Sequence, residues 1–179
     1  TASPEQRKKY LEPYAAGETS SAIAISEPGA GGDPAGMKTR AVKDGNDWVI
    51  NGRKIWISRI AKADFTIAMA VTDPNLGSRG GITAFLIDKG TPGLVVARAI
   101  PMLAGQRTYE VVFEDCRVPA ANRLGAEGEG YRIALSNLEA GRIGIAAQAV
   151  GMARAALDAA LAYAKERTSF GKVLADHQA

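Results

Sequence analysis

The sequence predicts an α+β fold in which an antiparallel β-barrel or sandwich is followed by a long helix. Residues 22–119 form short segments of alternating apolar and polar side chains, separated by turn sequences such as Asp44-Gly45. No helical pattern lies between these segments, which disfavours a parallel nucleotide-binding sheet because parallel strands need crossover helices. From residue 129 to 167, apolar side chains recur at intervals of three, four or seven, which is typical of a helix.

The strands are predicted by this alternation and by the turn residues between them. Asn51-Gly52 is a hairpin signal, so residues 47–58 are expected to form two strands joined by a tight turn. The other strands are expected at residues 36–43, 65–71, 82–87, 94–100 and 109–118.

Helices are predicted at both ends of the chain. Ser3 and Pro4 are a suitable N-cap and first residue for a short helix over residues 3–12, which Pro13 ends or kinks. The long helix is rich in alanine, which favours helix formation and close packing. A further helix is expected to begin near Ala175.

Composition excludes several classes of function. With 179 residues, 46% of them apolar and 23% charged, the chain has the composition of an ordinary globular protein. The net charge of +3 is small and scattered, which disfavours nucleic-acid and anionic-membrane binding. Cys116 is the only cysteine and His177 the only histidine, so neither a disulfide nor a structural zinc site is expected. We expect no signal peptide and no membrane-spanning segment.

Residues 23–33 change from alternating apolar residues to a glycine-rich turn. A surface loop is the simpler interpretation of such a string. Alternatively, glycines without Cβ let backbone N–H groups approach a phosphate or a ring carbonyl. Because Pro34 stands in place of a third glycine, this is not a dinucleotide fingerprint.

Residues 54–58 form a second segment with a polar end, which carries Trp56 and Ser58. Its separation in sequence from residues 23–33 suits a strand that neighbours the first segment. A strand tryptophan is usually in the core and a terminal serine is usually solvated. Because side chains alternate along a strand, however, Trp56 and Ser58 share one face. An aromatic plane beside a hydroxyl can wall a flat ring and hydrogen-bond to it, so the two segments together suggest a flavin site.

Two further candidates lie in the helical region. Arg142 is either the partner of Glu139 in a helical ion pair or a guanidinium that orients an anionic or carbonyl ligand. Residues 166–172 are either a normal helix end or a clamp in which Arg167 holds a pyrophosphate and Phe170 covers an adenine.

Five segments together resemble the acyl-CoA dehydrogenase family. They occur in the family's order, span nearly the whole chain, and include a run at 141–146 that most resembles the short-chain, butyryl-type branch. The segments are ISEPGAGGD at 25–33, NGRKIWIS at 51–58, VFEDCRVP at 112–119, GRIGIA at 141–146 and ERTSFGK at 166–172.

The resemblance implies three domains in an enzyme that is usually tetrameric. Residues 1–20 would end a helical domain, residues 21–120 would form the middle β domain, and residues 121–179 would begin a four-helix domain. We therefore expect the chain to be part of a longer protein. The location would be the cytoplasm in a bacterium and the mitochondrial matrix in a eukaryote.

The resemblance also implies FAD as cofactor and an acyl-CoA as substrate. Gly32, Glu139 and Arg142 would face the substrate. The residues implied to bind FAD are Ile23, Ile25, Ser26, Gly31, Gly32, Trp56, Ile57 and Ser58, together with Arg167, Thr168, Ser169, Phe170, His177 and Gln178 acting across a subunit interface.

The implied reaction removes an α proton and a β hydride from the acyl-CoA thioester to give a trans-2-enoyl-CoA. An electron-transferring flavoprotein would reoxidise the cofactor. No residue of this chain is expected to be the catalytic base or a metal ligand. Most members carry the catalytic glutamate beyond the matched segments, and a minority carry it where this chain has Gly141. Glu139 lies two residues earlier, on roughly the opposite side of a helix.

Three departures from the family pattern concern the site. Gly32 stands where a serine is common, Arg59-Ile60 replaces Asn-Gly, and residues 105–109 form a shorter loop. Two alternatives therefore stay open: a flavin-dependent oxidase or monooxygenase of the same architecture, and a non-catalytic fragment that mediates assembly.

Overall fold

A computed structural model describes residues 1–177, except for the side chain of Ala140. The chain forms two compact units, Thr1–Ala134 and Leu135–Ala179. The first unit contains a short helical segment, the β-sheet and the beginning of the long helix. The second contains the rest of that helix and a small hairpin.

The N-terminal helical segment begins as expected. The Ser3 hydroxyl accepts a hydrogen bond from the Gln6 N–H, and the Gln6 side chain accepts one from the Ser3 N–H, which completes a capping box. Three pieces follow one another without a break: helix α1 (Pro4–Gln6), a π-helical turn (Arg7–Leu11) and helix α2 (Glu12–Ala15). The helix thus continues three residues beyond its predicted end. Pro13, which has no N–H to donate, is the second residue of α2 and comes directly after the wider π-helical turn.

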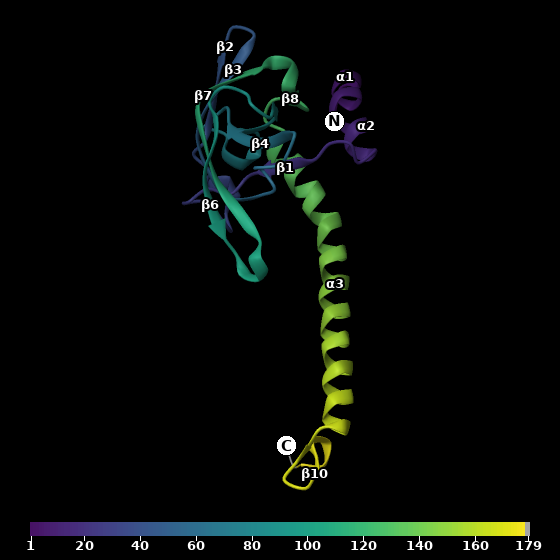
Figure 1. The fold of residues 1–179 in the computed structure, drawn as a ribbon. Helices are drawn as coiled ribbons and strands as arrows, with labels where there is room; N and C mark the ends of the chain where they lie inside the picture. The colour runs from purple at the N-terminus through teal and green to yellow at the C-terminus, as the bar shows by residue number, and fades with distance from the viewer. Residues whose placement is uncertain (178–179) are drawn as a thin grey trace. The chain divides into compact units, whose positions relative to one another are not determined.

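Most of the first unit is one mixed sheet (Figure 1). The strand order is β6-β7-β3-β2-β4-β5-β8, with β1 paired to β4. Most neighbours are antiparallel, as predicted, whereas β1 and β2 each pair with β4 in parallel. The strands are β1 (Ser21–Ala24), β2 (Arg40–Asp44), β3 (Asp47–Ser58), β4 (Phe65–Val71), β5 (Ile82–Asp88), β6 (Leu94–Pro101), β7 (Arg107–Pro119) and β8 (Arg123–Leu124).

The predicted hairpin at Asn51-Gly52 is wrong. Strand β3 runs through these residues without a turn, and the tight turn lies earlier, where Asp44 at the end of β2 pairs with Asp47. Gly52 is needed for a different reason: its φ is +151°, and a Cβ there would lie 2.6 Å from the Thr39 Cα. In the sequence, a glycine required by the close approach of two backbones thus looks the same as a glycine required by a turn.

The other predicted strands agree with the structure except near β2. Residues 34–36 form a 3-10 turn that the Asp33 side chain caps, so β2 begins only at Arg40 rather than at residue 36. The capping carboxylate accepts the Ala35 N–H at 3.2 Å. This local hydrogen bond competes with pairing in the sheet.

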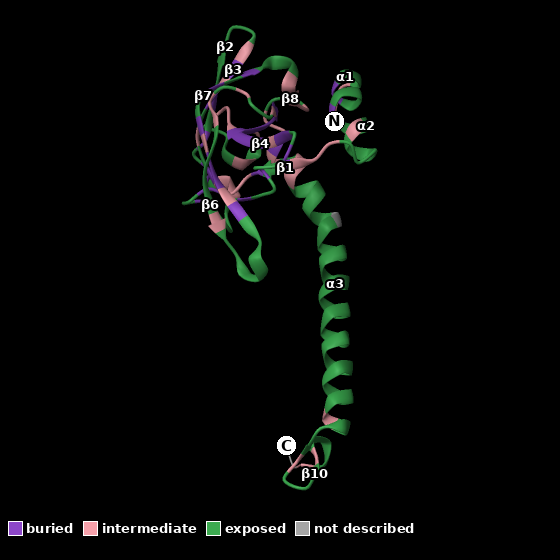
Figure 2. Cartoon of the chain, viewed as in Figure 1, coloured by how far each residue is buried: buried purple, intermediate pink, exposed green. Residues whose placement is uncertain are grey.

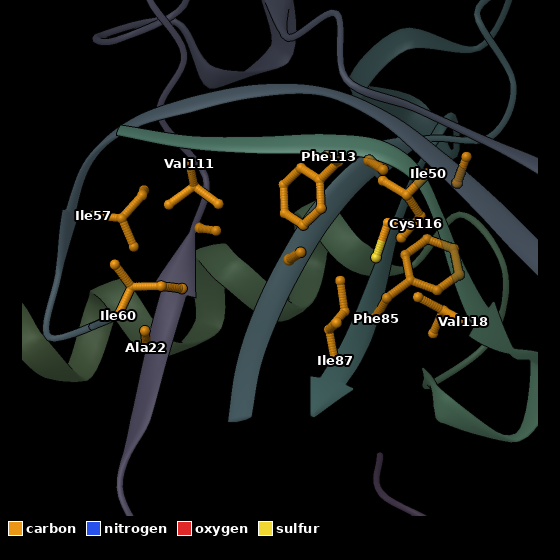
Figure 3. Packing of buried hydrophobic residues seen from close by; sticks show 14 of the residues in the cluster. Ala22, Ile50, Ile57, Ile60, Phe85, Ile87, Val111, Phe113, Cys116 and Val118 are labelled. Atoms are coloured by element: carbon orange, nitrogen blue, oxygen red, sulfur yellow. The ribbon is translucent and has the colours of Figure 1, made fainter. Parts of the chain in front are cut away.

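The main core lies between parts of the sheet that are not neighbours in strand order. Trp48 on β3 packs against Phe85 on β5 with ring centroids 5.4 Å apart, so the sheet folds over and its inward faces meet. Figure 3 shows Phe85 beside Cys116 and Val118 of β7. Burial raises the pKa of the Cys116 thiol to about 11. The thiol is therefore protonated at neutral pH, and its role is packing.

Two smaller clusters attach the helices to this unit. Tyr10 packs on Phe65 with ring centroids 4.9 Å apart, which fixes the N-terminal segment to the sheet. Tyr131 and Ile133, at the beginning of helix α3, pack against a cluster that contains Met69.

Helix α3 (Gly130–Glu166) agrees with the predicted helix to within one residue at each end. Figure 2 shows exposed residues along nearly all of its length. Large apolar side chains are among them, including Leu138, Ile143, Val150, Met152 and Leu157. Strands β9 (Thr168–Ser169) and β10 (Lys172–Val173) follow. Instead of the helix predicted near Ala175, Leu174–Asp176 form a single 3-10 turn.

By length and composition alone, α3 is long and apolar enough to cross a membrane. The expectation that no segment of the chain spans a membrane therefore stays a prediction. Length and composition do not distinguish a membrane span from a helix that packs inside a protein.

Candidate functional site

The glycine-rich loop after β1 lies against the middle of β3. The Ile55 N–H donates a hydrogen bond to the Ser26 carbonyl at 2.9 Å, although the two residues are far apart in the sequence. Ser26 therefore lies beside Ile55 of β3, the residue directly before Trp56. The structure thus brings together the two segments that the sequence analysis assigned to one site.

A buried ion pair holds this arrangement. The Lys54 side chain is 0% exposed, and its Nζ lies 2.9 Å from Oε1 of Glu27. The same Nζ donates to the Ile25 carbonyl at 3.0 Å and approaches the Met37 sulfur at 3.7 Å. The ammonium thus has a charged and a neutral acceptor in place of water.

Glu27 connects the ion pair to a third segment. Its carboxylate accepts the N–H groups of Lys38 at 2.6 Å and Thr39 at 2.9 Å. Burial by itself raises the pKa of the Glu27 carboxyl, but the hydrogen bonds from Thr39 and Lys38 and the charge of Lys54 outweigh burial and hold the pKa below its ordinary value. Burial lowers the pKa of Lys54, and the nearby Glu27 carboxylate partly offsets this effect.

This ion pair is not among the sites predicted from the sequence. A signal for it exists in β3, where Trp48, Ile50, Gly52 and Lys54 follow one another at the strand period of two. Lys54 thus falls on the inward face. A lysine at such a position needs a buried acidic partner, because a lone charge in a core is strongly disfavoured.

A β-bulge turns Trp56 out of the strand. The register between β3 and β7 changes from Lys54 opposite Val111 to Ile57 opposite Tyr109, so two residues on β3 face one on β7. Trp56 has a φ of +63°, a left-handed conformation that is rare for such a bulky residue. Its side chain is 53% exposed. Backbone strain of this kind is concentrated at functional sites.

Beyond the bulge, the residues of β3 point alternately into and out of the core. Ile57 is buried in the main core, so only its backbone is available to a ligand, and Ser58 is exposed like Trp56. Trp56 and Ser58 therefore share the exposed face, as predicted. Ile23 on β1 is also exposed, whereas Ile25 is half-buried.

The loop itself is a tight turn with an open outer side. Glu27 and Ala30 exchange backbone hydrogen bonds of 3.0 and 3.1 Å. A Cβ added at Gly31 or Gly32 would meet no atom within 4 Å. The backbone on this side is thus accessible to a ligand. A cavity of about 260 Å³ adjoins the loop and is lined in part by Pro28, Gly29 and Thr39.

Together these features fit a flat aromatic ligand that carries phosphate. Trp56 and Ile23 provide exposed apolar surface, Ser26 and Ser58 provide hydroxyl groups, and the glycine loop provides accessible backbone. Pockets for such ligands are mostly apolar, with a few placed polar groups.

The second unit gathers the other predicted cofactor residues in one hairpin. Thr168 and Ser169 form β9, and the turn to β10 consists of Phe170 with a φ of +50° and Gly171 with a φ of +81°. Two positive φ values are typical of a type I′ turn. The turn leaves the Phe170 side chain 97% exposed.

Residues that flank the hairpin are hydrogen-bonded to it. His177 Nε2 lies 3.0 Å from the Ser169 carbonyl, and the Leu174 N–H donates to the Arg167 carbonyl at 2.8 Å. Arg167 follows directly on α3 and is exposed. Gln178 lies outside the described residues.

The three predicted substrate residues belong to different units. Gly32 is in the first unit, whereas Glu139 and Arg142 are exposed on α3 in the second. Their shared role stays a prediction. Among residues 1–177, no three His, Cys, Asp or Glu side chains are grouped so that they could hold a metal ion.

Two family models match the chain in sequence order. Residues 22–116 match the acyl-CoA dehydrogenase middle domain, and residues 128–179 match the acyl-CoA dehydrogenase C-terminal domain. The chain belongs to the acyl-CoA dehydrogenase family. Within this family, α3 lies in the C-terminal domain, and the glycine-rich loop and Trp56 lie in the middle domain.

Curated members of the family match nearly the whole chain. An acyl-CoA dehydrogenase of Bacillus subtilis is 44% identical over 176 residues, which is 97% of this chain and 46% of the relative. The CarC subunit of the caffeyl-CoA reductase–Etf complex of Acetobacterium woodii is 42% identical over 177 residues, 98% of this chain and 46% of the relative. The chain spans about half the length of these relatives.

Several solved structures have the same fold as this chain. Butyryl-CoA dehydrogenase from Megasphaera elsdenii has a TM-score of 0.90 at 42% identity and covers 98% of this chain, which spans 46% of it. The FAD complex of PigA has a TM-score of 0.92 at 37% identity, with 99% and 46% covered. The prolyl acyl carrier protein oxidase AnaB has a TM-score of 0.91 at 37% identity, with 98% and 47% covered. The α+β fold class is thus confirmed.

Proposed function

We propose that the protein containing this chain is an FAD-dependent acyl-CoA dehydrogenase that acts on short-chain acyl-CoA thioesters. The observation that carries the proposal is the position of Ser26 beside the strand segment of Trp56 and Ser58, in a chain that belongs to this family. The short-chain preference is supported by the likeness to butyryl-CoA dehydrogenase from Megasphaera elsdenii.

The residues of the first unit fit FAD, the group bound in the PigA complex. Ser26 and Ser58 would hydrogen-bond to the polar edge of the ring, and Ile23, Ile25, Trp56 and the Ile57 backbone would form its wall. The Gly31 and Gly32 backbone would approach its polar groups. When bound, FAD supplies the acceptor for the hydride from the substrate β carbon.

The second unit would contribute to the same cofactor across a subunit interface. Arg167, with Thr168 and Ser169, would hold the pyrophosphate, and the exposed Phe170 ring would cover the adenine. His177 would support the hairpin through its contact with Ser169. This role requires a homo-oligomer, and we propose a tetramer.

The reaction needs a carboxylate that removes the α proton while the hydride leaves the β carbon. The substrate thioester carbonyl acidifies the α carbon, and the product is the trans-2-enoyl thioester. We assign no residue of this chain as the base. Gly32, Glu139 and Arg142 would contact the substrate.

The partner that accepts electrons would be an electron-transferring flavoprotein. The likeness to CarC, a subunit of a complex with such a flavoprotein, supports this assignment. We propose the cytoplasm as the location in a bacterium and the mitochondrial matrix in a eukaryote.

The test uses the whole protein purified with its flavin. Under anaerobic conditions, butyryl-CoA is expected to bleach the visible flavin band and to yield crotonyl-CoA. Bleaching is expected to be faster with butyryl-CoA than with acyl-CoA thioesters of longer chain. Ser58→Ala is expected to weaken FAD binding about threefold to tenfold, because one hydrogen bond is lost. Lys43→Ala is the control, because Lys43 is exposed on β2 and pairs with Trp48, ten residues along β3 from Ser58. A purified protein without FAD affinity would overturn the proposal and favour a role in assembly alone.

A flavin-dependent oxidase is the second candidate. The likeness to the oxidase AnaB favours it, because that protein has the same fold at 37% identity. Mixing the reduced protein with oxygen separates the candidates: reoxidation within seconds indicates an oxidase, and slow reoxidation over minutes indicates a dehydrogenase.

A further inference from the structure

Two consecutive residues of β3 hold three consecutive residues of the glycine-rich loop. Lys54 Nζ contacts the Ile25 carbonyl at 3.0 Å and the Glu27 carboxylate at 2.9 Å. Between these two contacts, the Ile55 N–H donates to the Ser26 carbonyl at 2.9 Å. Ser26 is thus fixed on both sides, and the loop cannot slide along β3 without breaking all three contacts.

The Glu27 carboxylate extends the same connection to residues 38 and 39. It accepts both of their N–H groups, and Thr39 in turn packs directly on Gly52 of β3. The carboxylate and the ammonium are both buried, so water does not compete for their hydrogen bonds. The loop, the segment before β2, and β3 thus meet at one charged centre.

Stability alone does not account for a buried ion pair. Replacing such a pair by neutral groups of similar size is often neutral or stabilising, because both charges lose their hydration in the folded protein. What the pair contributes is one defined arrangement of the segments it joins. The arrangement matters here because the residues that follow the pair are the predicted flavin contacts.

Trp56 shows why the register of β3 must be fixed. It follows Ile55 directly and has a left-handed backbone in a bulge. A strained conformation persists only where the surrounding contacts determine it. The contacts of Lys54 and Ile55 with the loop are immediately next to this position.

We propose that Glu27 and Lys54 are positioning residues that fix the glycine-rich loop against β3 and so set the spacing between Ser26 and the Trp56–Ser58 face. Both charged groups are buried. It acts through Ser26 on one segment and through Trp56 on the other. This inference rests on the proposed function, because the consequence of the spacing is flavin binding.

The test is the double variant Glu27→Gln with Lys54→Met in the whole protein. Both charges are removed together, so no unpaired charge remains buried, and Met has nearly the length of Lys. The variant loses the contact with the Ile25 carbonyl. We expect it to fold, to bind FAD at least about tenfold more weakly, and to show a shifted visible flavin band, because a misplaced contact reduces binding and orientation.

Glu27→Asp is the second variant and keeps both charges. Its carboxylate is one methylene shorter, so it cannot reach Lys54 and the two N–H groups at once. We expect a folded protein, shown by an unchanged far-UV circular dichroism spectrum. Its FAD binding is expected to be weaker than that of the wild type, as in the double variant. The result stays informative even if the double variant does not fold.

The matched control is Lys9→Met with Asp88→Asn. Lys9 Nζ lies 2.7 Å from Oδ2 of Asp88, and both side chains are about half exposed. Neither residue belongs to the glycine-rich loop or to β3. FAD affinity and the flavin spectrum are expected to equal those of the wild type.

The outcomes separate this inference from the proposed function. Wild-type affinity and an unshifted flavin spectrum in both variants would overturn the positioning role while the proposed function stands. Failure of the wild-type protein to bind FAD would overturn both.

Discussion

At the scale of single residues, Gly52 allows two segments to pack in contact. Its φ is +151°, and a Cβ there would meet the Thr39 hydroxyl oxygen and lie 2.6 Å from the Thr39 Cα. The Thr39 backbone cannot move freely, because its N–H is bonded to Glu27. Gly52 therefore has a steric role in the arrangement that holds the candidate site.

Gly52→Ala is expected to lower the free energy of unfolding by about 3 kcal/mol, because overpacking and an unfavourable φ act together. The measurement is urea unfolding followed by tryptophan fluorescence. Gly29→Ala, where a Cβ meets no atom within 4 Å, is the control and is expected to change the free energy by less than about 0.5 kcal/mol. Equal effects of the two changes would contradict the steric explanation.

Glu27 makes stability depend on pH. The pKa of its carboxyl in the folded protein is below the ordinary value of 4.5, although burial alone would raise it, because hydrogen bonds and Lys54 outweigh burial. As the pH falls below about 4.5, the unfolded chain binds the proton before the folded chain does. The contribution of Glu27 to stability is therefore present above this pH and is lost as the pH falls through the folded pKa.

We expect the free energy of unfolding of the wild type to fall more steeply below pH 4.5 than that of the double variant Glu27→Gln with Lys54→Met. Unfolding curves at half-unit intervals from pH 6 to pH 3 would measure the difference in slope. Parallel pH profiles of the two proteins would show that the Glu27 carboxyl does not titrate as described.

At the scale of elements, β3 is a single strand whose ladder with β7 has two irregularities. One is the bulge at Trp56, and the other lies between Ile50 and Gly52, where Asp115 on β7 has a φ of +46°. Asn51 supports it by donating to the Asp115 carboxylate at 2.9 Å and accepting the Asp115 N–H at 2.8 Å. Alternation along β3 therefore predicts which residues up to Lys54 are buried, while the bulge after Lys54 changes which of the following side chains face outward.

Asn51→Ala is expected to lower the free energy of unfolding by about 1 kcal/mol, because both hydrogen bonds are lost. Asp115→Gly is expected to be neutral or to raise it by up to about 1 kcal/mol, because glycine relieves the positive φ and keeps the N–H. Thermal unfolding of the two variants would measure these changes. A loss in Asp115→Gly as large as that in Asn51→Ala would argue against strain at this residue.

At the scale of the whole molecule, the exposed apolar side chains of α3 need a cover. The chain spans about half the length of its curated relatives, and the C-terminal family domain begins with this helix. A broad apolar face on a helix is normally buried against another element. The division into domains at residues 20 and 120 stays a prediction.

We expect the purified 179-residue chain to leave butyryl-CoA unchanged in the presence of an artificial electron acceptor, whereas the whole protein converts it. The reason is that no residue of the chain is assigned as the base. Chromatographic detection of crotonyl-CoA would measure turnover. Its formation by the chain alone would show that a carboxylate within these residues removes the α proton.

The sequence by itself determined the α+β class, the positions of most strands and the long helix. It also gave Ser26, Trp56 and Ser58 as candidates for one site. These features are local: alternation, helical periodicity and turn residues depend on neighbours within a few positions of each other. The strand period predicts that Trp56 and Ser58 share a face, but continued from the buried Lys54 it would turn that face inward.

Only the tertiary structure decided the role of Gly52, the bulge that exposes Trp56 and the ion pair between Glu27 and Lys54. Each depends on a contact between segments that are distant in sequence, and the two charges of the pair are 27 residues apart. An isolated Lys54 or Gly52 has several interpretations, such as a solvated side chain or a turn. The contact across the folded sheet selects one of them, because only there are the charge buried and the two backbones in contact.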